Sequence, residues 1–201
     1  CVNASCASAV VSVVDGASSL AEFISIAIGA DGLPVLSYHT VDDPTLRVAK
    51  CANSSCTGIA TISVVDDPTN SVGSHNSIAV PSDGLPVISY RDETAGRLKV
   101  AKCANPACTG NATISTVFEQ PGTAVAKGTA AAIGADGMPV ISYNGRLVKC
   151  ADLSCATINT SPRFFSSEDF SMAIGSDGYP VISLLGGANL VVAKCASPTC
   201  R

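Results

Sequence analysis

The chain has 201 residues, of which 14% are charged and 47% hydrophobic, and its 12 basic and 16 acidic side chains give a formal net charge of −4. This composition excludes nucleic acid as a partner, because phosphate binding requires a clustered positive surface. No run of eighteen apolar residues occurs, so no transmembrane segment is predicted. The chain starts at Cys1 rather than Met and shows no signal-peptide pattern, so we expect a processed form.

All ten cysteines belong to C-x4-C units that recur every 45 to 52 residues: Cys1/Cys6, Cys51/Cys56, Cys103/Cys108, Cys150/Cys155 and Cys195/Cys200. A fixed recurrence of this length is an internal repeat. It predicts one domain over residues 1–201 with four repeats, about 1–50, 51–102, 103–149 and 150–194, followed by a terminal C-x4-C segment, 195–201.

In chain order, the first predicted element is a strand over residues 9–14, which matches the fourth apolar run of a repeat. The first full copy then has short runs at 25–28, 34–38, 46–50 and 60–65. These runs are rich in Val and Ile, too short for helices, and bounded by Gly, Asp, Pro and Ser, which is typical of strands.

An Asp-Gly pair joins the first two runs of every copy, at Asp31-Gly32, Asp83-Gly84, Asp136-Gly137 and Asp177-Gly178. Asp accepts local backbone hydrogen bonds and Gly adopts positive φ without strain, so each pair predicts a tight hairpin rather than a metal or acid site. Four-stranded units of about 45 residues in tandem indicate an all-β fold, a four-bladed β-propeller. A β-solenoid is the main competitor.

The last repeat has three runs, whereas residues 9–14 supply one spare strand. We expect that strand to complete the last blade, either of its own chain or of a neighbouring molecule. An exchange that does not close on itself generates a fibre. The five C-x4-C units leave two pairings open: local pairs, or a crossed pairing of Cys6 with Cys195 that involves Cys1 and Cys200.

Zinc binding is the rival interpretation of the cysteines, but one pair per blade separates the ligands, and only His39 and His75 are available. We therefore predict disulfides that each close a small loop, no metal, no cofactor and a compartment outside the cytosol, secreted or at the cell surface. Cys1 could alternatively carry the acyl group of a lipoprotein.

We interpret the remaining repeated residues as structural. One lysine precedes each first cysteine and is expected on a solvated rim: Lys50, Lys102, Lys149 and Lys194. The acidic pairs Asp42-Asp43, Asp66-Asp67 and Asp92-Glu93 are expected to be solvated loop charges or weak calcium ligands. Four sequons, at Asn3, Asn53, Asn111 and Asn159, make glycosylation possible.

A lectin is the main functional alternative, since sugar sites use an aromatic platform beside polar groups. Tyr38, Tyr90 and Tyr143 share one repeat position, but Leu184 replaces them in the last copy, which favours packing between blades. Catalysis is not expected, because no nucleophile motif and no carboxylate pair in a cleft can be identified.

The pattern "SIAIGADGLPVISY…LKVAKCANxxC" resembles a tandem repeat of secreted bacterial proteins that are taken to form propeller-like domains. The Asp-Gly hairpin is also loosely similar to the Asp-box of sialidase-type propellers. The resemblance implies a secreted propeller but no particular chemistry. We therefore predict a non-catalytic structural or adhesive module whose partner is a second copy of itself, with a surface glycan as the alternative ligand.

Overall fold

The computed structural model describes residues 9–16, 20–66, 69, 71–119, 128–160, 163, 170–186 and 188–200. These residues form antiparallel sheets in an all-β architecture. No helix in the described part of the chain is long and apolar enough to cross a membrane.

Four sheets follow one another along the chain. Sheet 1 contains β1 (Ala21–Ile28), β2 (Pro34–Thr40), β3 (Leu46–Lys50) and β4 (Thr61–Val64). Sheet 2 contains β5 (Val72–Ala79), β6 (Val87–Asp92), β7 (Arg97–Lys102) and β8 (Thr113–Glu119). Sheet 3 contains β9 (Thr129–Ile133), β10 (Pro139–Tyr143), β11 (Arg146–Cys150) and β12 (Ile158–Thr160). Sheet 4 contains β13 (Phe170–Ile174), β14 (Pro180–Gly186) and β15 (Asn189–Lys194).

The first hairpin of each sheet has the chemistry that the Asp-Gly pair predicts. In sheet 1, Gly32 has φ 75° and its amide donates to the Gly29 carbonyl at 2.9 Å. The Leu33 amide donates to Asp31 Oδ1 at 3.0 Å, and Pro34 then starts β2, where its missing amide breaks no ladder bond. The chain therefore reverses at the same point in every repeat.

A lysine from the third strand binds the aspartate of each of these turns and so stabilises the turn. Lys50 Nζ lies 2.8 Å from Asp31 Oδ1 and 2.9 Å from the Leu33 carbonyl oxygen. The hydrogen bond from Lys50, followed by that from the Leu33 amide, lowers the pKa of Asp31. The same ion pair recurs as Lys102–Asp83, Lys149–Asp136 and Lys194–Asp177.

The expectation of a solvated lysine rim is therefore wrong for Lys50, Lys102 and Lys149, which are buried. A buried ammonium group needs a carboxylate partner, and the hairpin aspartate supplies it. Lys194 forms the same pair but is more exposed, because it lies on the last sheet.

Four C-x4-C units form local disulfides with Cα–Cα distances of 4.8 to 5.0 Å: Cys51–Cys56, Cys103–Cys108, Cys150–Cys155 and Cys195–Cys200. The last of these contradicts a crossed bond between Cys195 and Cys6. Cys1 and Cys6 lie outside the described residues. Several disulfides indicate an oxidising compartment.

The spacing suffices for a local bond because the second cysteine of each unit turns the chain back. It adopts positive φ, 53° at Cys56 and Cys108 and 54° at Cys155. The Cys155 amide also donates to the Asp152 carbonyl at 3.1 Å, as the Cys56 amide does to that of Asn53. Five residues are therefore enough to bring the two Cα atoms within the range that a disulfide requires.

The disulfides do more than close small loops, because some of their cysteines belong to the apolar cores, and Cys155 is one example. Its side chain is 2% exposed and belongs to the core between sheets 2 and 3, together with Cys150 and Val117. Cys108 has the same place in the core between sheets 1 and 2. In these two loops the second cysteine points inward, because the bonded sulfur atoms form an apolar surface that the neighbouring sheet covers.

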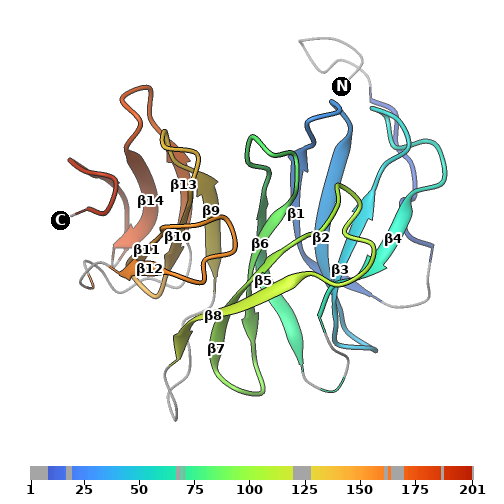
Figure 1. The fold of residues 1–201 in the computed structure, drawn as a ribbon, viewed down its shortest axis with the longest axis horizontal. Helices are drawn as coiled ribbons and strands as arrows, with labels where there is room; N and C mark the ends of the chain where they lie inside the picture. Colours follow the sequence, from blue (N-terminus) through green and yellow to red (C-terminus); the bar gives the residue numbers. More distant parts are fainter. Residues whose placement is uncertain are drawn as a thin grey trace.

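The sheets are arranged in sequence order as an open arc, from sheet 1 to sheet 4 (Figure 1). Three separate apolar cores lie between neighbouring sheets. The core between sheets 1 and 2 shows the pattern, because Leu46 and Val48 from sheet 1 pack with Ile88 and Tyr90 from sheet 2. Each sheet thus has a leading face toward the preceding sheet and a trailing face toward the following one.

Residues 9–16 differ from the prediction, because they form no strand and do not join sheet 4. They lie instead beside sheet 1, where the Ser12 hydroxyl donates to the Ser55 carbonyl and the Tyr38 hydroxyl donates to Asp15 Oδ2 at 2.6 Å. A single extended segment without a paired neighbour has no ladder bonds to hold it as a strand. Closure of a ring by this segment within one chain is therefore not what the structure contains.

Candidate functional site: the two end faces

The trailing face of sheet 4 exposes residues that are buried at the same repeat positions in the other sheets. Counting back from the lysine that ends the third strand, Leu190 occupies the position of Leu98, and Val192 that of Val100. Leu98 is 0% exposed and Leu190 is 80% exposed. The difference arises because sheet 3 covers Leu98, whereas no described residue covers Leu190 to a similar extent.

The leading face of sheet 1 shows the complementary pattern. Ile26 on β1 corresponds to Ile78 on β5, and both follow a serine that pairs with the second strand of its sheet. Ile78 is 5% exposed because it packs against sheet 1, whereas Ile26 is 60% exposed. Leu20 and Ile24 on the same side are exposed as well.

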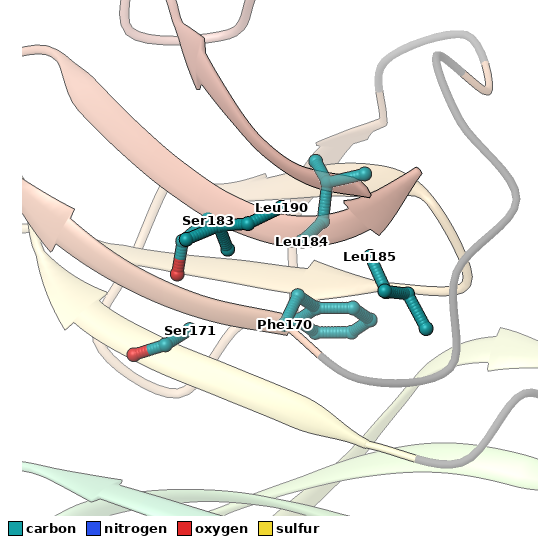
Figure 2. A pocket seen from close by; sticks show the side chains of 6 residues that line it. All are labelled: Phe170, Ser171, Ser183, Leu184, Leu185 and Leu190. Carbon is teal, nitrogen blue, oxygen red and sulfur yellow. The ribbon is translucent and has the colours of Figure 1, made fainter. Parts of the chain in front are cut away.

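A groove of about 440 Å³ lies on sheet 4, and the exposed Leu190 is one of the residues that line it. Figure 2 shows the side chains around it, which come from β13, β14 and β15: Phe170, Ser171, Ser183, Leu184, Leu185 and Leu190. The lining is mostly apolar, with two hydroxyl groups. Such a surface fits a partner that brings apolar side chains and a few hydrogen-bonding groups.

A second groove, of about 120 Å³, lies on the leading face of sheet 1. Val14 and Asp15 form one side of it, and the strands of sheet 1 form the rest through residues including Ile24, Leu36 and Tyr38. Both ends of the arc therefore present apolar surface with a depression in it.

Polar contacts between the sheets also follow the repeat. The Ile78 amide donates to Ser25 Oγ at 3.2 Å, and the Ala131 amide donates to Ser77 Oγ at 3.0 Å. On β6, Ser89 Oγ lies 2.8 Å from Thr129 Oγ1 of sheet 3. Ser183 holds the position of Ser89 in sheet 4 and lines the groove there. The end face thus carries the hydroxyl group that links neighbouring sheets inside the molecule.

A buried network crosses from the residues that follow the fourth strand of sheet 1 to sheet 2. The Tyr90 hydroxyl donates to Asp66 Oδ2 at 2.6 Å, and Lys99 Nζ lies 3.1 Å from carboxylate oxygens of both Asp66 and Asp92. Burial, followed by the Asp66 charge, raises the pKa of Tyr90. Desolvation acts to lower the pKa of Lys99, but its hydrogen bonds to the two carboxylates outweigh it and raise that pKa.

The network corrects the interpretation of two acidic pairs. Asp66 and Asp92 are buried and bound to one lysine, so they are not solvated loop charges. Asp43 does lie in an exposed pair, with Arg47 at 3.1 Å. Asp67 lies outside the described residues. No group of three or more His, Cys, Asp or Glu side chains that could hold a metal ion occurs in the described ranges.

The residues at the positions of Asp66, Tyr90 and Lys99 change together in the later sheets. Phe118 replaces the acid in the second core, where its ring lies 5.3 Å from the Tyr143 ring and beneath the Arg146 guanidinium. Burial raises the pKa of Tyr143 to about 12, and its buried hydroxyl has no hydrogen-bond partner among the described residues. In sheet 4 both Tyr and cation are replaced by Leu184 and Val191.

We expect Tyr90→Phe and Tyr143→Phe to differ in their effect on stability. Tyr90→Phe removes a hydrogen-bond donor from the buried Asp66 carboxylate and should lower the free energy of unfolding by about 1–3 kcal/mol. Tyr143→Phe removes a hydroxyl with no partner in the described chain, so its cost should be close to zero. Urea unfolding of the two variants measures the difference, and equal losses would contradict the assignment of the network.

Tyr90 and Tyr143 are buried between sheets, as the packing interpretation predicts, whereas Tyr38 is buried on the leading face of sheet 1, where it bonds to Asp15 rather than packing between two sheets. His39 is also buried, with Nδ1 2.9 Å from the Val72 carbonyl oxygen. His75 packs against Phe23 with ring centroids 4.1 Å apart.

The sequons occupy different environments. Asn53 Oδ1 accepts bonds from the Ser55 and Thr57 amides and so caps its cysteine loop, as Asn105 and Asp152 do in the next two loops. Asn111 and Asn159 are exposed, and Asn3 lies outside the described residues. Asn53 thus has a structural role that requires no glycan.

The comparisons with known proteins give the fold. No family model and no curated protein matches the chain. Solved structures do match, at low identity. A protein of unknown function from Dyadobacter fermentans is 13% identical with a TM-score of 0.58, over 84% of this chain and 51% of its own.

Two further matches are enzymes by their titles. The endo-arabinase from Bacteroides thetaiotaomicron is 12% identical with a TM-score of 0.57, over 86% of this chain and 74% of its own. A GH43 enzyme from Xanthomonas citri in complex with xylose is 12% identical with a TM-score of 0.56, over 90% of this chain and 72% of its own. At this identity the likeness shows a propeller-like fold alone. The chain spans about half of the Dyadobacter protein's length.

The exposed apolar residues of the end faces were not singled out from the sequence. An available signal was the alignment of Leu190 with Leu46 and Leu98, which marks it as an interface position. The sequence does not say whether a sheet covers that position.

Proposed function

We propose that this chain is a non-catalytic, extracellular structural or adhesive module that associates head to tail with copies of itself. The leading face of sheet 1 in one copy packs on the trailing face of sheet 4 in the next. The observation that carries the proposal is the exposure of Leu190 at a position where the equivalent leucines of sheets 1 and 2 are fully buried.

Repeat equivalence supports a second copy as the occupant. Inside the chain, Leu46 and Val48 on a trailing face already pack with Val72 and Ile78 on a leading face. Leu190 and Val192 repeat the first pair, and Leu20 and Ile26 repeat the second with apolar residues. A contact between sheets 4 and 1 of two copies thus continues an interface that the molecule already contains three times.

Burial of the apolar end faces favours association. Burying one leucine that is otherwise exposed stabilises a contact by about 1.5–3 kcal/mol, and each end face carries several large apolar residues. Because the two faces differ, the contact is heterologous, and it produces either rings or open filaments. The extracellular location in the proposal rests on the disulfides.

The ion pairs that the aspartate carboxylates form support the non-catalytic part of the proposal. Asp66 and Asp92 share Lys99, and the hairpin aspartates are bound to their lysines. These groups stabilise sheets and turns, which is a structural task.

Sedimentation velocity over a range of protein concentrations tests the proposal. The native protein should show larger species as concentration rises, whereas Leu190→Asp should remain monomeric, because docking would bury an unpaired carboxylate. Ile59→Asp is the matched control, since Ile59 is an exposed apolar residue in the loop before β4 and belongs to neither end face. Native protein that stays monomeric throughout, or Leu190→Asp that associates as well as Ile59→Asp, would overturn the proposal.

A further inference from the structure

Residues 9–15 already occupy the place of a fourth strand that belongs to a sheet preceding sheet 1. In the described chain, β4 and the residues just after it bond to sheet 2, and two of these bonds are relevant here: the Ser63 hydroxyl donates to the Ala107 carbonyl, and Asp66 accepts from the Tyr90 hydroxyl. Ser12 and Asp15 make the same two bonds to Ser55 and Tyr38 of sheet 1. The spacing is also the same, three residues in each case.

The outer edge of β15 is the matching feature at the other end. In sheets 1 to 3, this edge of the third strand pairs with a fourth strand, β4, β8 or β12. Among the described residues, β15 pairs only with β14. A strand edge of this kind is a template for an added strand.

We infer that residues 10–13 of one copy form the fourth strand of sheet 4 in the adjoining copy, pairing antiparallel with β15. The inference rests on the proposed head-to-tail contact and specifies how its two copies are joined. Docking sheet 4 on the leading face of sheet 1 brings β15 alongside residues 10–13, because that segment is held on the same face by Ser55 and Tyr38.

The register follows from sheet 1, where Arg47 pairs with Val64 and Ala49 with Ile62. Val191 and Ala193 hold the positions of Arg47 and Ala49, counted from the lysine that ends the strand. Val13 and Val11 hold the positions of Val64 and Ile62, counted from the serine that contacts the next cysteine loop. Val191 therefore pairs with Val13, and Ala193 with Val11.

In the single chain the segment exposes side chains that strand pairing with a second copy would cover. Val13 is 79% exposed, whereas the equivalent Val64, which lies in a paired strand, is 49% exposed. The backbone groups of residues 10–13 gain ladder bonds at the same time. These backbone hydrogen bonds add to the apolar contact between the two faces.

Cysteine cross-linking between separate molecules tests the register. One preparation carries Val13→Cys or Val11→Cys, the other Val191→Cys or Ala193→Cys, and each pair is mixed under mild oxidation and analysed by mass spectrometry. The described native cysteines are all in disulfides and so do not compete. We expect rapid heterodimer formation for the pairs 13/191 and 11/193, whose Cβ atoms lie about 4.5–5.5 Å apart when directly opposite.

The mismatched pairs 13/193 and 11/191 are the controls, and they should cross-link at least about tenfold more slowly, since diagonal neighbours lie about 7–8 Å apart. Four equal rates, or faster reaction of the mismatched pairs, would overturn the register. Association by sedimentation without any of these cross-links would overturn strand donation and leave the proposed function standing. Native protein that does not associate at any concentration would overturn the proposed function itself.

Discussion

Leu98→Ala should lower the free energy of unfolding by about 2–5 kcal/mol, because it removes a fully buried side chain and leaves a cavity between sheets 2 and 3. Leu98 is 0% exposed and belongs to the second core with Val100, Ile141 and Tyr143. Close packing on all sides leaves the neighbouring side chains little freedom to fill the space. A loss of this size would consume a large part of the stability of an ordinary domain.

Leu190→Ala is the matched control for this substitution, since it makes the same chemical change at the same repeat position. Leu190 is largely exposed in the single chain, so its truncation should change stability by less than about 0.5 kcal/mol. Both variants should be unfolded in urea at a protein concentration low enough to keep the chains monomeric. Similar losses for the two variants would mean that sheet 4 is covered in the monomer, which would contradict the open arc.

Gly73→Ala should be the second large destabilisation, about 2–5 kcal/mol, because backbone strain and steric overlap add together. Gly73 has φ 97°, and a Cβ there would lie 2.7 Å from Leu46 Cα and 2.9 Å from Leu46 N. The obstacle is backbone rather than a flexible side chain, so β5 would have to move away from β3. Gly128 has φ 100° before β9, the same conformation at the start of the next sheet.

Gly110→Ala separates the two contributions to the Gly73 result. Gly110 has φ 81°, and a Cβ there would meet nothing within 4 Å. Its substitution should therefore cost only the left-handed backbone strain, about 1–2 kcal/mol. The thermal midpoints of the two variants measure the difference. If Gly110→Ala were as harmful as Gly73→Ala, steric contact between sheets 1 and 2 would not be the reason for the glycine.

Within the molecule, the interfaces between sheets vary in composition but keep their geometry. The Asp66–Tyr90–Lys99 network in the first core becomes Phe118, Tyr143 and Arg146 in the second, and an apolar pair in sheet 4. Charge and hydrogen bonding are thus exchanged for ring stacking and then for aliphatic packing. The stacking geometry is thus kept while the chemistry of the contacts changes.

Local chemistry within the sequence determined much of this structure. Asp31-Gly32 and its equivalents specify hairpins, since the aspartate binds the following amide and the glycine adopts positive φ. The C-x4-C spacing predicts local disulfides, since a pair five residues apart can close within one turn of chain. Repeat length and four apolar runs per copy specify the four-stranded sheets.

Only the tertiary structure decided what each repeated residue does once the sheets are stacked. Lys50 and Asp66 look like surface charges in the sequence, but they are buried because neighbouring strands and sheets surround them and supply their partners. Cys155 looks like part of a small surface loop, but the stacking of sheet 3 on sheet 2 places it in a core.

The two ends of the chain show the same dependence on neighbours. Residues 9–14 have the pattern of a strand, yet among the described residues no neighbouring strand offers them a ladder partner, so they form no strand. Leu98 and Leu190 are the same residue at the same repeat position. Their burial differs because burial depends on the neighbouring sheet rather than on the residue itself.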